Sequence, residues 1–160
     1  MVKFKIMREI NYNDEDIVDH HGVAAVIKND DGEILMQRHA KYGFWTIPVG
    51  KVKGEQDIIE GLKQEIQEEC NIKVEEAIEI VFREYQYKRK GHLVNVLSHL
   101  FEIKKYSGVV KNNEPKKHGQ QIFLSLEKIK LLPYLSDLTL LYLGTLGFRR
   151  EPHITDIKQK

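Results

Sequence analysis

The sequence has a single cysteine, Cys70, among its 160 residues. An internal disulfide is therefore excluded, and so is a zinc site built from several cysteine ligands. No apolar run approaches the roughly 20 residues that a membrane-spanning helix needs. Residues 1–16 are charged throughout and lack the apolar core of a signal peptide. These absences predict a cytoplasmic protein with no membrane partner.

What is present is the composition of a globular domain. Hydrophobic residues make up 41% of the chain and charged residues 31%, with a net charge of +1. A chain of this length can bury one core, and no repeat, low-complexity tract or linker divides it. We predict a single domain over residues 1–160, ending in a polar, frayed tail at 148–160.

The pattern of apolar and turn residues predicts one α/β (α+β) domain with a mixed central sheet. Residues 23–28 and 33–38 flank the turn Asn29-Asp30-Asp31-Gly32 and predict a β-hairpin. Further strands are predicted at 3–9, 74–87, 93–103 and 121–126, and helices at 57–70, 127–129 and 136–146.

The helix over 57–70 has clear start and stop signals. Asp57 is the predicted N-cap, and Glu60 three residues later completes a capping box. Asn71 is a suitable residue for the helix end. The predicted buried stripe recurs every four residues and comprises Ile58, Leu62, Ile66 and Cys70.

Three carboxylates, Glu65, Glu68 and Glu69, lie near the end of this helix. At helical spacing Glu69 falls inside the buried stripe, with the other two on its flank. A carboxylate withdrawn from water needs a partner, or its pKa rises until it is neutral. Bound Mg²⁺ or Mn²⁺ is one suitable partner. A lysine or arginine from elsewhere is the alternative, and the helix alone favours neither.

The loop Val49-Gly50-Lys51 precedes the helix. Here backbone groups can approach a ligand and Lys51 can meet a phosphate, although a Gly-Lys pair alone is weak evidence. Beside three carboxylates, the loop favours a site for a metal and a phosphate.

The stretch from Gly50 to Ile72 resembles the Nudix box, Gly-x5-Glu-x7-Arg-Glu-U-x-Glu-Glu-x-Gly-U, in which U is a bulky apolar residue. Without gaps, Glu65-Ile66 matches Glu-U and Glu68-Glu69 matches the acidic pair. The flanking segments GVAAVIKNDDGEILMQR and FWTIPVGKV resemble the family's first hairpin and its approach to the box. The chain is identified as a member of the Nudix (MutT-type) hydrolase family over about residues 21–130. This resemblance implies an α/β/α sandwich.

Four positions depart from the family pattern: Val49 and Asn71 replace glycines, Gln56 replaces the box glutamate, and Gln64 replaces the box arginine. The family's glutamate and arginine can pair and brace the loop against the helix. Two amides can hydrogen-bond in their place without charge. The loss of the arginine removes a fixed positive charge beside the glutamates.

The resemblance implies hydrolysis of the pyrophosphate bond of a nucleoside diphosphate derivative, with a nucleoside triphosphate as the expected substrate and Mg²⁺ or Mn²⁺ as cofactor. The implied metal ligands are Glu65, Glu68, Glu69 and the backbone carbonyl of Val49, and the three glutamates are also the expected catalytic residues. The candidate substrate-binding residues are Arg38 and Lys51 for phosphate, and Trp45, Phe44 and Phe123 for the base. For each aromatic, core packing is the favoured interpretation.

The family commonly has a further acid in the loop before its last strand, where this chain has Gln120. Glu114, Glu84 and His118 are the substitutes that the sequence offers, and it does not decide between them. For His118 the favoured interpretation is a histidine in a surface loop.

The alternative function is a catalytically weak or silent Nudix fold that binds a nucleotide as a regulatory module. The altered box favours this alternative, whereas the three intact glutamates favour a hydrolase. A nucleic-acid partner is not expected, except for a triphosphorylated RNA end that would bind the basic turn Lys88-Arg89-Lys90. The favoured interpretation of this turn is a solvated hairpin tip. The sequence is also compatible with a homodimer.

Overall fold

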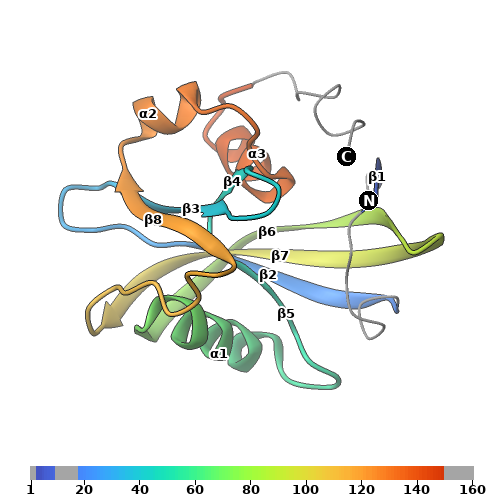
Figure 1. The fold of residues 1–160 in the computed structure, drawn as a ribbon. Coiled ribbons are helices and arrows are strands. Elements are labelled where there is room, and N and C mark those ends of the chain that lie inside the picture. The colour runs from blue at the N-terminus through green and yellow to red at the C-terminus, as the bar shows by residue number, and fades with distance from the viewer. Residues whose placement is uncertain (1–2, 10–17, 150–160) are drawn as a thin grey trace.

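The computed structural model describes residues 3–9 and 18–149, and their strands are layered between helices (Figure 1). Helix α1 lies on one side of the strands, and α2 and α3 lie on the other, as expected for an α/β/α sandwich. The strands are β1 (Lys3–Glu9), β2 (His20–Val26), β3 (Ile34–His39), β4 (Trp45–Thr46), β5 (Val49–Lys51), β6 (Lys73–Arg89), β7 (His92–Ser107) and β8 (His118–Leu124). The helices are α1 (Ile58–Cys70), α2 (Leu126–Leu131) and α3 (Asp137–Thr145).

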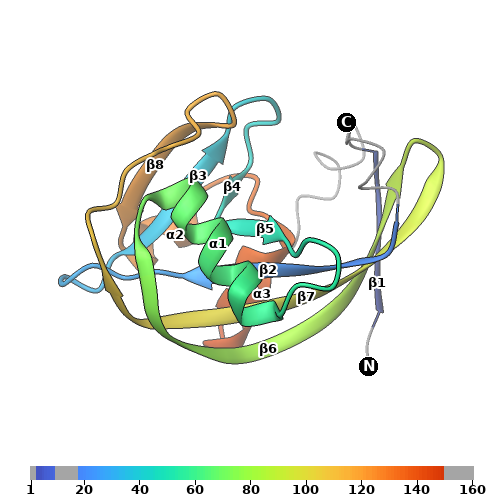
Figure 2. The same ribbon diagram turned by 90° about the horizontal axis from the view of Figure 1, so that it is seen from below.

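The strands divide between two sheets. The larger sheet is mixed, with the order β1-β6-β7-β2-β5, and the smaller is antiparallel, with the order β4-β3-β8. In the larger sheet β1 runs parallel to β6 and β2 runs parallel to β7, whereas β6–β7 and β2–β5 are antiparallel. Figure 2 shows α1 in front of the strands, with β3, β4 and β8 gathered beyond its C-terminal end.

The hairpin predicted for residues 23–38 is correct at its turn and wrong for the strands beyond it. The Asn29 side chain accepts hydrogen bonds from the backbone of Asp31 and Glu33, which closes the turn. The backbone N–H of Leu35 still donates to Ile27 at 2.9 Å. The strands then separate because their partners differ: β2 lies between β7 and β5, and β3 lies between β4 and β8.

The other predicted elements are present, with shifted ends. Strand β1 occupies the predicted 3–9 at one edge of the larger sheet. Strands β6 and β7 are longer than predicted at both ends of their hairpin. The turn between them is reduced to Lys90 and Gly91, with φ of 48° and 79°. The tail beyond residue 149 lies outside the described residues, and a single domain over the whole chain stays a prediction.

Helix α1 has the ends and the buried face that its sequence predicts. The Asp57 side chain accepts hydrogen bonds from the backbone of Ile59 and Glu60, and Asn71 ends the helix with a φ of 64°. The stripe packs into a core cluster with residues of β2 and β7, including Val23, Ala25 and Phe101. This packing fixes the direction in which the last turn presents its carboxylates. In the part of the chain that the structure describes, no helix is long and apolar enough to cross a membrane.

Candidate metal centre

Glu69 is the most deeply buried of the three carboxylates on α1. Its side chain is 1% exposed, as the helical spacing predicts for a residue inside the buried stripe. Glu65 is half-buried, and the side chain of Glu68 is 47% exposed. The last turn of α1 therefore offers one carboxylate in the core, one at its edge and one in solvent.

Lys117 and His118 supply the protein partners of Glu69. The Lys117 ammonium donates to Glu69 Oε1 at 2.8 Å, and Nε2 of His118 lies 3.4 Å from the same oxygen. Burial alone would raise the pKa of Glu69, but the His118 hydrogen bond and the Lys117 charge outweigh it and lower that pKa. A lysine from elsewhere, the alternative to a metal, is thus present in the structure.

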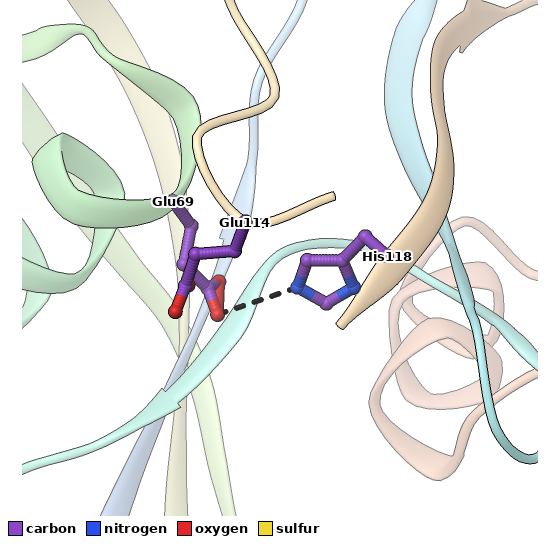
Figure 3. Close-up of side chains that lie close together, drawn as sticks. All are labelled: Glu69, Glu114 and His118. Carbon is purple, nitrogen blue, oxygen red and sulfur yellow. Dashed lines mark hydrogen bonds and ion pairs between the residues drawn. The ribbon is translucent and has the colours of Figure 1, made fainter. Parts of the chain in front are cut away.

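A third potential ligand, Glu114, comes from the loop before β8. Figure 3 shows the Glu114 and Glu69 carboxylates beside one another, with the His118 ring facing Glu69. Each of the three residues offers one ligand atom, and these atoms all lie within 4.8 Å of one another. The loop is held against the end of α1 by hydrogen bonds from the backbone of Lys111 to Cys70 and of Asn113 to Glu69.

His118 is a buried residue, and its interpretation as a surface-loop histidine is wrong. It is 1% exposed because β8 begins at this residue, so its side chain is directed by the sheet and not by the loop. Its Nε2 also lies 3.2 Å from the side-chain nitrogen of Gln37, which is itself fully buried. Both contacts are made by Nε2, and the buried Nδ1 has no hydrogen-bond partner among the described residues.

Glu65 lies against the backbone of Gly50 at the edge of the same group. A Cβ added to Gly50 would come within 2.5 Å of the Glu65 Cγ and 2.6 Å of its Oε2. Burial, with further contributions from Glu69 and Glu68, raises the pKa of Glu65 to about 7. Only glycine at position 50 leaves room for this carboxyl.

We expect Gly50→Ala to push Glu65 out of its place. The free energy of unfolding should fall by about 1 kcal/mol, because the new methyl group overpacks the loop. Chemical denaturation measures this change. Gly144→Ala is the matched control, because nothing lies within 4 Å of a Cβ at this helical position. It should leave stability unchanged or raise it, and an equal loss in both variants would contradict the role of Gly50.

The two glutamines that replace the family's charged pair make the expected hydrogen bond. Gln56 Nε2 donates to Gln64 Oε1 at 2.7 Å, and Gln64 Nε2 donates to Glu68 Oε1 at 2.9 Å. The brace between loop and helix is therefore retained without charge, and it extends to a carboxylate of the box.

A cavity of about 430 Å³ adjoins this group of residues. Its wall includes Val49, Gly50, Lys51, Lys117, His118, Arg89, His39, Tyr42, Phe44 and Asp137. The rings of Tyr42 and Phe44 stack on His39, with centroids 5.0 and 4.9 Å apart. The wall of the cavity thus combines cationic side chains, of which Lys117 contacts Glu69, with a group of stacked rings.

Residues 18–139 match the family model described as NUDIX domain. The chain belongs to the Nudix family. The crystal structure of the MutT NUDIX hydrolase from Burkholderia pseudomallei is 25% identical, with a TM-score of 0.66, over 79% of this chain and 96% of that one. An Ap4A hydrolase from C. elegans, solved as a binary complex, is 22% identical with a TM-score of 0.54, over 79% and 91% of the two chains.

A further relative of this Nudix chain matches over a shorter segment. The 8-oxo-dGDP phosphatase NUDT18 from Danio rerio is 42% identical over 53 residues. The match covers 31% of this chain and 16% of that protein, so the chain spans only a small part of its length.

The donor atoms of the Nudix site suit a divalent cation. Among the described residues, the buried Glu69 Oε2 has no hydrogen-bond partner, so a buried carboxylate oxygen remains available. Glu114 and His118 cluster with Glu69 and add the oxygen and imidazole donors that divalent metals accept, and Glu65 lies nearby against Gly50. Of the substitutes for the family's loop acid, Glu114 and His118 are therefore at the site. Glu84 lies on β6, opposite Leu97, and is not part of the cluster.

The structure places Arg38, Trp45 and Phe123 away from the Nudix glutamates. Side chains alternate along a strand, so Gln37 of β3 faces His118 while Arg38 points to the opposite face. Arg38, Trp45 and Gln120 line a separate cavity of about 350 Å³. Phe123 packs against the core cluster under α1, in line with its favoured interpretation. Of the substrate-binding residues that the sequence predicts, Lys51 and Phe44 line the cavity beside the glutamates.

Proposed function

We propose that the protein hydrolyses the pyrophosphate bond of a nucleoside diphosphate derivative, with Mg²⁺ or Mn²⁺ as cofactor. A nucleoside triphosphate is the expected substrate. The observation that carries the proposal is that Lys117, the ion-pair partner of the buried carboxylate of Glu69, lines a cavity with further cations in its wall. Clustered carboxylates beside fixed positive charges suit a metal that bridges the protein to phosphates.

The metal would be held by Glu69, Glu65 and Glu68 on α1, with Glu114 or His118 as the ligand from the loop. The backbone carbonyl of Val49 is a further candidate, because Val49 adjoins Gly50 in the cavity wall. The chemistry that bound Mg²⁺ or Mn²⁺ supplies is neutralisation of phosphate charge and polarisation of the phosphorus centre.

The cavity would bind the nucleotide in two parts. The wall contains Lys41, Lys51, Lys117 and Arg89, and the last three would contact phosphate oxygens. Tyr42 and Phe44 would stack on the base, a role for which the sequence offers Trp45, Phe44 and Phe123. A volume of about 430 Å³ lies within the range of small-molecule sites.

Glu68 is the proposed general base. It is the most exposed of the three glutamates, so it can reach a water molecule at the mouth of the site. Gln64 donates a hydrogen bond to Glu68 Oε1 and leaves Oε2 to orient that water and take its proton. Glu69 is occupied by Lys117, and the pKa of Glu65, raised to about 7 by burial and its acidic neighbours, keeps part of that group protonated at neutral pH.

The test is an assay of the purified protein against a nucleotide panel. The panel comprises nucleoside triphosphates, 8-oxo-dGDP, Ap4A, ADP-ribose and a triphosphorylated RNA, each with Mg²⁺, with Mn²⁺ and with a chelator. Release of phosphate or pyrophosphate that depends on the metal supports the proposal. Tight nucleotide binding without turnover of any substrate would instead favour the regulatory module.

A further inference from the structure

We propose that Lys117 is an exchangeable counter-ion of Glu69, which a divalent metal must displace and which then serves the substrate phosphates. The inference rests on the proposed function, because it assumes that a metal binds at Glu69. In this inference Lys117 sets the affinity of the site for the metal and couples metal binding to nucleotide binding.

The two partners of this ion pair differ in burial. The Glu69 side chain is 1% exposed, whereas that of Lys117 is 47% exposed. Glu69 is fixed in the packed face of α1, and Lys117 reaches it from the loop on a long, flexible side chain. The ammonium can therefore leave for water or for another anion once a different cation takes its place at Glu69, while the carboxylate stays.

The local charge explains why Lys117 occupies this place. Burial would lower the pKa of the Lys117 ammonium, but Glu69 outweighs it, helped by Glu114 and Glu65, and raises that pKa. Glu69 thus holds the ammonium at 2.8 Å, and the charges of Glu114 and Glu65 favour it from nearby. A divalent cation at the same carboxylates would neutralise the same charges, so the metal and the ammonium compete for them.

The altered Nudix box makes Lys117 the main positive charge beside the buried carboxylate. The position of the family's arginine is occupied by Gln64, whose amide bonds to Gln56 and Glu68 without charge. Another lysine near the acidic face, Lys53, lies 3.9 Å from Glu68, with both side chains well exposed. Such an exposed pair contributes little, so the cation that matters for the buried carboxylate comes from the loop before β8.

The released ammonium already has a second place to act. Lys117 forms part of the wall of the 430 Å³ cavity, together with Lys51 and Arg89. When a nucleotide occupies that cavity, its phosphates offer Lys117 new partners. The nucleotide should then ease the displacement of Lys117, so metal and nucleotide should each tighten the binding of the other.

The experiment compares Lys117→Met with Lys116→Met, an adjacent exposed lysine in the same loop. Mn²⁺ affinity is measured by titration calorimetry, with and without a non-hydrolysable nucleoside triphosphate analogue. Lys117→Met should bind Mn²⁺ about fivefold more tightly than the wild type, because the competing ion pair is gone. It should also melt at a lower temperature in chelator and lose the coupling between Mn²⁺ and the analogue, and Lys116→Met should match the wild type.

The outcomes separate this inference from the proposed function. If the wild type binds no Mn²⁺, the proposed function fails. If the wild type binds Mn²⁺ and Lys117→Met binds it equally well or more weakly, the counter-ion role fails and the proposed function stands. Should Lys117→Met not fold, the acylation rate of lysines in the wild type replaces it. Mn²⁺ should then raise the reactivity of Lys117 relative to Lys116, and an unchanged ratio would overturn the inference.

Discussion

Replacing Glu68 by glutamine is expected to lower the metal-dependent rate of nucleotide hydrolysis by about 10²-fold or more, the range for loss of a general base. The substitution removes one negative charge and the proton acceptor while keeping the shape of the side chain. The new amide oxygen can still accept the hydrogen bond that Gln64 now donates to Glu68. Initial rates of product release with Mg²⁺ and with Mn²⁺ measure the change.

The exposure of Glu68 makes this loss of activity interpretable. Its side chain is 47% exposed, so the substitution should leave the melting temperature in chelator unchanged. Glu60→Gln is the matched control, because it makes the same change in an exposed residue of the same helix, outside the site. A Glu68→Gln variant that keeps the full rate would remove Glu68 from the mechanism and leave Glu65 as the base.

The sequence predicts the helix that carries the site better than it predicts the loop opposite. The signals for this helix are all local: an apolar residue at every fourth position, Asp57 as N-cap and Asn71 as the end. They are enough to place Glu69 in the core. The hydrogen bond between Gln56 and Gln64 is also predictable, because both residues belong to one short unit.

The contacts that the sequence leaves undecided all depend on tertiary structure. Lys117 meets Glu69 across 48 positions of the chain, and Gln37 meets His118 across 81. No periodicity of the sequence links residues so far apart. The sequence around Lys117 and His118 therefore gives no sign that both contact Glu69. The sequence does not predict that β2 and β3 belong to different sheets for the same reason, because the sheet that each strand joins depends on its pairing with β5, β7 or β8.

Glu65→Gln is expected to raise stability without metal and to lose most of the stabilisation that metal provides. Burial, and then Glu69 and Glu68, raise the pKa of Glu65 from 4.5 to about 7. The folded protein therefore holds this proton more tightly than the unfolded chain does. The contribution of Glu65 to the free energy of unfolding falls as pH rises from 4.5 to about 7 and stays low above it.

The glutamine variant removes this penalty and also removes a proposed metal ligand. In chelator at pH 8 it should be more stable than the wild type by at most about 3 kcal/mol, and near pH 4.5 the two should be alike. Metal at 100 times its Kd should stabilise the wild type by about 2.7 kcal/mol and the variant by much less. Melting temperatures over this pH range, with chelator and with Mn²⁺, measure both effects, and Glu60→Gln should show the wild-type response to pH and to Mn²⁺. A variant that is less stable than the wild type in chelator at pH 8 would show that Glu65 is not strained by its neighbours. An unchanged response to Mn²⁺ would show that Glu65 is not a ligand, and Glu114 and His118 would then have to complete the site with Glu69.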